Sequence, residues 1–113
     1  MTEGSDQAYD RDKLVELFGD DPRTLAEVER EFLDTAREAT REITGTDDFT
    51  AIARAAHRLK GASGMIGALA LRRIAEAVER AAKAEDLSTV RRLRELFDHE
   101  VQRVAEQAGV TAD

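Results

Sequence analysis

Apolar residues recur at steps of three and four along most of this 113-residue chain, and this spacing is the strongest constraint on its fold. Such a period places apolar side chains on one face of an α-helix and charged side chains on the other. It is clearest between residues 22 and 44, at Leu25, Val28, Phe32, Ala36, Ala39 and Ile43. The same pattern over residues 47–66, 69–84 and 86–108 predicts three further long helices.

Residues that favour helix ends separate these stretches. Acidic cap candidates stand at Asp20 or Asp21, at Asp47 or Asp48, and at Asp86. Pro22 suits the first turn of a helix, Gly45 interrupts the pattern after residue 44, and Gly67 lies near the end of the next stretch. Since each connection is only a few residues long, successive long helices should pack antiparallel.

A shorter apolar group precedes the long helices. Leu14, Leu17 and Phe18 are spaced to form a small apolar face, and Gly19 suits the end of that short helix. Residues 1–7 are small and polar, which predicts a disordered tail ahead of one helical-bundle domain over residues 8–110. The predicted fold is therefore all-α: an up-and-down antiparallel four-helix bundle with a short additional N-terminal helix.

Composition excludes several classes of protein. The chain has no cysteine, so disulfides and thiolate metal sites are excluded, and its net charge of -7 argues against nucleic-acid binding. It has neither a membrane-length apolar run nor a signal-peptide pattern, so the expected location is the cytoplasm, away from membranes. A single complete bundle is expected to be a monomer.

His57 is the residue with the most unusual setting. On the helix predicted over residues 47–66, it points on the order of 140° away from the centre of the apolar face. Ala53, Gly61 and Gly64 share its side, and each glycine inside a helix costs about 1 kcal/mol relative to alanine. We interpret the glycines as a flat surface on which a second protein can reach the imidazole, whereas Gly67 is explained better by close helix packing.

Basic residues surround this histidine. Lys60 is three residues away and therefore a neighbour on the helix surface, from which its ammonium group can reach a phosphoryl group on the imidazole. Arg54 and Arg58 flank the same region, although both can equally be solvated surface charges. An unprotonated imidazole nitrogen is a good nucleophile near neutral pH, and phosphoryl transfer depends mainly on positioning and charge stabilisation. A partner protein can supply the metal ion for such a reaction.

The run HRLKGAS from His57 to Ser63, followed by Gly67 and Ala68, resembles the signature of histidine-containing phosphotransfer (HPt) domains. The segments around Phe32 and Glu79 are also similar to that family, and the resemblance extends over residues 14–104. One departure is Ala62, at a position that is often serine in the family. Ser63 falls on the core side of the helix and is assigned a structural role.

The resemblance implies a phosphocarrier in a multistep phosphorelay, without kinase activity of its own. His57 would be the phosphorylation site, Lys60 the cation that stabilises the phosphoryl group, and Gly61 the position that gives access. Ala53, Arg54, Arg58 and Gly64 would help to dock the partner. The implied partners are receiver domains of response regulators, which would hold the Mg²⁺, and a hybrid or sensor histidine kinase; no cofactor is expected on this chain.

Two alternatives remain open, and two others are disfavoured by particular residues. The phosphoacceptor domain of a chemotaxis-type kinase shares the fold, and a helical adaptor with an inert His57 is also compatible with the pattern. A dimerisation domain of a sensor kinase usually has an acidic residue after its histidine, where this chain has Arg58, and no nucleotide-binding domain is attached. A metal site is disfavoured because His57 and His99 are the only histidines and lack ligand spacing; His99 is expected to be exposed.

Overall fold

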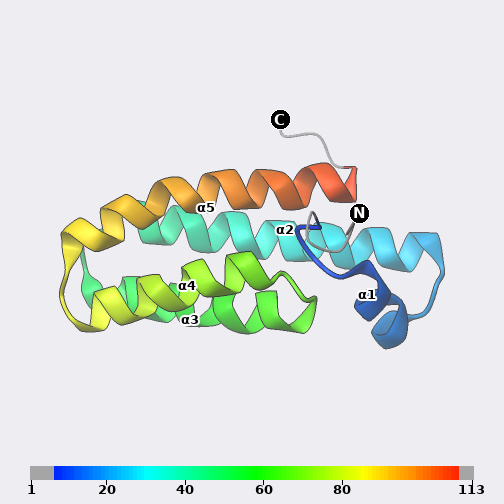
Figure 1. Ribbon diagram of the computed structural model, residues 1–113, viewed down its shortest axis with the longest axis horizontal. Helices are drawn as coiled ribbons and strands as arrows, with labels where there is room; N and C mark the ends of the chain where they lie inside the picture. The colour runs from blue at the N-terminus through cyan, green and yellow to red at the C-terminus, as the bar shows by residue number, and fades with distance from the viewer. Residues whose placement is uncertain (1–6, 110–113) are drawn as a thin grey trace.

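A computed structural model describes residues 7–109, and every regular element within this range is helical. The elements are α1 (Arg11–Phe18), α2 (Pro22–Thr44), α3 (Phe49–Met65), α4 (Leu69–Lys83) and α5 (Leu87–Ala108), shown in Figure 1. The all-α prediction is therefore confirmed. Six of the seven residues predicted to form a disordered tail, and residue 110 at the predicted end of the domain, lie outside the described residues.

Side-chain caps set where the long helices begin. Asp21, Asp48 and Asp86 each accept a hydrogen bond from a backbone N–H in the first turn of the helix that follows. Pro22 occupies the first turn of α2, as its fixed backbone angle favours. Of the two candidates before α3, Asp48 is the cap, while Asp47 faces α5 instead.

The four long helices pack in a ring around one core. α3 packs against α2 and α4, and α5 packs against α2 and α4. α3 and α4 run antiparallel, since His57 on α3 meets Glu79 on α4 while Gly64, farther along α3, lies against Arg72, nearer the start of α4. Ile52, Leu59 and Val78 are among the fully buried side chains between these helices.

The N-terminal segment differs from the prediction in how it is anchored. α1 lies at one end of the bundle and packs mainly against α2, with Lys13 reaching the carbonyl of Gly64 on α3. Of its expected apolar face only Leu14 is buried, whereas Leu17 and Phe18 are exposed. A helix of two turns at the end of the bundle can cover little apolar surface. Ala8 and Tyr9, just before α1, are buried instead.

Hydrogen bonds connect this segment to the C-terminal ends of α3 and α5. The Gln107 side chain accepts from the backbone N–H of Ala8 and Tyr9 and donates to the carbonyl oxygen of Tyr9. The backbone N–H of Asp10 donates to the carbonyl of Ile66, at the end of α3. The segment therefore joins the ends of α3 and α5.

Gly67 follows α3 and is required for two reasons. Its φ is +71°, which favours glycine, and an added Cβ would lie 2.6 Å from the Cβ of Asp10. A close neighbour is present, but it is the N-terminal segment, so the predicted helix packing at Gly67 was wrong. Any larger residue would push this segment away from the end of α3.

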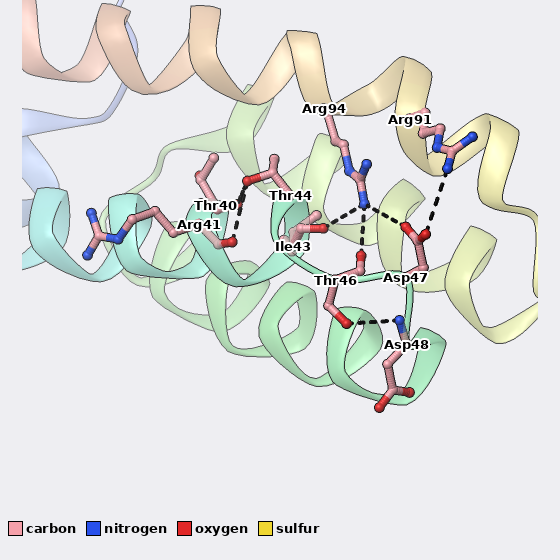
Figure 2. A network of polar contacts seen from close by, with 9 residues as sticks. All are labelled: Thr40, Arg41, Ile43, Thr44, Thr46, Asp47, Asp48, Arg91 and Arg94. Atoms are coloured by element: carbon pink, nitrogen blue, oxygen red, sulfur yellow. Dashed lines mark hydrogen bonds and ion pairs between the residues drawn. The ribbon is translucent and has the colours of Figure 1, made fainter.

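The connection between α2 and α3 is held by α5 (Figure 2). Arg94 donates to the backbone carbonyls of Ile43 and Thr46, at 2.9 and 3.0 Å, so it satisfies acceptors left over at the end of α2. Asp47 forms longer ion pairs with Arg91 and Arg94, each at 3.8 Å. These contacts fix the point at which α3 begins, two turns before His57.

No helix in the described range is long and apolar enough to cross a membrane.

Candidate functional site

His57 stands on the outer face of α3, as the helical phase predicts. Its side chain is 67% exposed, while Ala56 and Leu59 beside it in sequence are buried. The imidazole is nevertheless held in place, because its Nδ1 lies 3.0 Å from Oε2 of Glu79 on α4. The ring is thus both accessible to a second molecule and fixed by the neighbouring helix.

Glu79 is the residue that organises this site. It lies on the buried side of α4, between Ala75 and Ala82, with only 7% of its surface exposed. Lys60 contacts its Oε1 at 3.2 Å, and Lys83 contacts its Oε2 at 3.2 Å. One carboxylate therefore joins a histidine and a lysine from α3 to a second lysine from α4.

The charge state of Glu79 follows from these contacts. Burial alone raises the pKa of the carboxyl group, but hydrogen bonds from Lys83, Lys60 and His57 outweigh burial and lower the pKa below its usual value. Glu79 is consequently ionised near neutral pH. An ionised carboxylate only accepts hydrogen bonds, so the His57 nitrogen that faces it carries the proton.

This hydrogen bond selects the reactive nitrogen of the imidazole. With the proton on Nδ1, the lone pair of neutral His57 is on Nε2, at the other side of the ring. Nε2 has no hydrogen-bond partner among the described residues, and the side chain is mostly exposed. The arrangement therefore offers one oriented nucleophilic nitrogen to an incoming group.

Lys60 is in the site, as expected from its spacing to His57, but Glu79 holds it. Its side chain is 26% exposed, so it lies against Glu79 on α4 and not in open solvent. Its ammonium group and the imidazole nitrogen Nδ1 share one carboxylate. A positive charge is thus fixed within the immediate surroundings of the ring.

The two glycines near His57 have different surroundings. A Cβ added at Gly61 would meet no heavy atom within 4 Å, so the predicted flat, open surface exists one turn beyond His57. A Cβ at Gly64 would touch the Arg72 side chain at 3.4 Å, so this part of the expected bare surface is covered by an arginine from α4. The backbone carbonyl of Gly64 also accepts a hydrogen bond from Lys13 at 3.2 Å. Ala53, before His57, is partly buried.

The expected basic zone is smaller than the sequence suggested. Arg58 turns toward α2 and binds both carboxylate oxygens of Glu42, at 3.0 and 2.9 Å, so its charge is offset. The sequence left open whether Arg58 joins Arg54 in a basic zone or is a solvated surface charge, and α2 supplies a paired acid that one helix alone does not reveal. Arg54 is exposed. The cations that contact Glu79, beside His57, are Lys60 and Lys83.

The sequence reading gave no role to Glu79 or to Lys83. One signal was present: Glu79 is an acid within an otherwise apolar stripe of α4 that contains Leu71, Ala75 and Ala82. Its partner on α3 is 22 residues away, a separation that only the packing of two helices brings together. Ser63 is fully buried, as its phase predicted, and its Oγ has no hydrogen-bond partner within residues 7–109. The same range contains no group of three or more metal-binding side chains, and His99 is exposed as expected.

Comparison with known protein families gives a match over most of the chain. The family model of the Hpt domain matches residues 13–107, which is most of the chain. The chain belongs to the Hpt domain family, whose members are phosphocarriers in two-component phosphorelays and interact with kinases and response regulators. No curated protein and no solved structure matches the chain.

Proposed function

We propose that this protein carries a phosphoryl group on Nε2 of His57, accepting it from, and donating it to, aspartates of response-regulator receiver domains. The observation that carries the proposal is the hydrogen bond of 3.0 Å between Nδ1 of His57 and Oε2 of Glu79. A surface histidine without a role gains nothing from a buried carboxylate that fixes its ring. Here the fixed ring turns its free nitrogen outward.

The chain's own part in the reaction is small. Nε2 attacks the phosphorus of an aspartyl phosphate, the N–P bond forms, and the P–O bond to the aspartate breaks. The ring keeps its Nδ1 proton against Glu79, so no general base has to remove a proton. Positioning and charge stabilisation account for most of the catalysis in phosphoryl transfer. We propose that the receiver domain supplies the Mg²⁺.

The docking surface that we propose surrounds His57 on α3. It comprises Ala53, Arg54, Gly61 and Gly64, with the paired Arg58 at its edge, and Gly61 is its most open point. A receiver domain must bring its aspartyl phosphate to reacting distance, about 3–3.5 Å from Nε2. An exposed imidazole beside a position without a side chain permits that approach.

The test is phosphoryl uptake by the wild type and by two matched variants. The chain is mixed with a panel of phosphorylated receiver domains from the same cell, and phosphohistidine is followed by ³¹P NMR and by its lability in acid. His57→Gln should abolish uptake. His99→Gln changes the only other histidine, which is exposed on α5, and should take up phosphate like the wild type.

Uptake by His57→Gln at the wild-type rate would refute the proposal. Failure of the wild type to accept phosphate from any receiver domain would favour the helical adaptor instead. A phosphoacceptor domain of a chemotaxis-type kinase would give a different result. Such a domain would be phosphorylated by a kinase domain with ATP before any receiver domain was added.

A further inference from the structure

Glu79 contacts more positive charge than its own single negative charge can neutralise. Lys60 and Lys83 both contact it at 3.2 Å, and His57 contacts it at 3.0 Å. With a neutral imidazole, two ammonium groups face one carboxylate, so the cluster carries one net positive charge. Asp47 also meets two cations, Arg91 and Arg94, but at the longer distance of 3.8 Å and through an exposed carboxylate, and Glu42 meets only Arg58.

Phosphorylation changes this balance in a defined way. Neutral His57 attacks through Nε2 and retains its Nδ1 proton, so the ring becomes a cation while the attached phosphoryl group carries two negative charges. The aspartate of the donor leaves as a carboxylate, which balances atoms and charges. The cluster, which had one excess positive charge, becomes neutral. The new ring cation faces Oε2 of Glu79, the atom that Lys83 contacts in the unmodified protein.

We infer that Glu79 exchanges its counter-ions when His57 is phosphorylated. The imidazolium ring then neutralises Glu79, and Lys83 turns with Lys60 to the phosphoryl oxygens. Lys83 is thus the second cation of the phosphorylated site, and Glu79 stores both cations until the phosphoryl group arrives. This inference rests on the proposed phosphorylation of His57.

The placement of Lys83 suits such a movement. Its side chain is 68% exposed, so it is free to turn outward on its flexible stem, and its only ion pair in the described residues is with Glu79. It lies one turn along α4 from Glu79, on the same exposed edge as the imidazole. Arg58 donates two hydrogen bonds to Glu42 and would have to break them before it could contact the phosphoryl group.

The exchange has a measurable effect on the lifetime of phosphohistidine. In the loose transition state of phosphoryl transfer the phosphoryl group loses negative charge as its bond to nitrogen breaks. Cations on its oxygens therefore stabilise the ground state more than this transition state and slow spontaneous hydrolysis. Loss of one exposed ammonium contact should raise the hydrolysis rate by about two- to fivefold.

The experiment uses the full chain phosphorylated on His57 by phosphoramidate, a donor that needs no docking surface. Half-lives are compared for the wild type, Lys83→Gln, Lys83→Arg and Arg80→Gln. Lys83→Gln should shorten the half-life, and Lys83→Arg should restore most of it. Arg80→Gln removes the same charge from a neighbouring exposed position that pairs with Glu76, and should behave like the wild type.

A second measurement reports on Lys83 directly. The chain has three lysines, Lys13, Lys60 and Lys83, so ¹⁵N-lysine labelling gives three ammonium signals. Phosphorylation should move the signals of Lys60 and Lys83 and leave that of Lys13, which is bound to the carbonyl of Gly64. A wild-type half-life in Lys83→Gln, or an unmoved Lys83 signal, would overturn the inference alone. A wild-type chain that is never phosphorylated would overturn the phosphocarrier function as well.

Discussion

Replacing Gly61 by leucine should stabilise the fold while it blocks transfer from a partner. Gly61 lies in the interior of α3, where a Cβ would have no heavy atom within 4 Å. Nothing has to move to admit the new side chain, and leucine favours a helix over glycine by about 0.8 kcal/mol. For a domain of this size the melting temperature should rise by about 3–6 °C.

The effect on transfer has the opposite sign. The leucine side chain would stand one turn beyond His57, in the space that a receiver domain needs for its approach. A displacement of about 1 Å in the reacting atoms can cost about 100-fold in rate, so we expect transfer from a phosphorylated receiver to fall at least about tenfold. Phosphoramidate is small enough to pass the leucine, so its reaction with His57 should change by less than about twofold.

The assay compares these two donors on the same variant. Ala26→Leu is the matched control, because it adds the same side chain at an exposed position on α2, away from His57. This control should keep wild-type rates with both donors. Wild-type transfer from a receiver to Gly61→Leu would refute the reasoning on access, and equal losses with both donors would show that the variant damages the imidazole site instead.

Two further predictions concern the cluster around Glu79. Lys60→Ala should slow transfer from a receiver by about two- to tenfold. It should leave the free energy of unfolding within about 1 kcal/mol of the wild type, because Glu79 keeps His57 and Lys83 as partners. Quench-flow and thermal unfolding test this, and wild-type rates would make Lys60 a plain surface charge. Because its contacts lower the pKa of Glu79, the stability contributed by its carboxylate is present above about pH 4.5 and is lost as the pH falls through the lowered pKa. Glu79→Gln should therefore lose less stability than the wild type as the pH falls below about 4.5, and an equal loss in urea titrations would contradict the assignment.

The parts of the fold that depend on local chemistry could be predicted from the sequence. Asp21 with Pro22, Asp48 and Asp86 mark helix starts because their side chains and backbone preferences act within one turn. The exposure of His57 followed from the helical period in the same way. These features need no knowledge of which helix packs against which.

The features that could not be predicted depend on contacts with a second helix. The sequence did not decide the role of Arg58, whose partner Glu42 is on α2. Gly64 was expected to be bare, but Arg72 on α4 covers it. The largest omission was Glu79, whose position opposite His57 is fixed by the register between α3 and α4, and the residue types on either helix do not specify that register.

The surroundings of Glu79 argue for function when it is compared with the other buried acids of the described residues, Glu29 and Glu100. Glu29 accepts hydrogen bonds from Tyr9 and Arg11 and so ties the N-terminal segment to α2, and Glu100 pairs with Arg103 on its own helix. Both roles are structural. A buried carboxylate is in itself weak evidence for stability, because its desolvation offsets much of what its partners contribute.

Glu79 is desolvated, with that energetic cost, at a position where alanine or leucine would extend the apolar stripe of α4. What it adds there is an orientation of the exposed His57 ring and a fixed location for two ammonium groups. None of these three partners needs the carboxylate to remain in the folded chain, because all three side chains can reach solvent. The proposed chemistry at Nε2 of His57 gives the carboxylate a purpose: a rigid helix holds Glu79 so that the charges are already arranged before a phosphoryl group arrives.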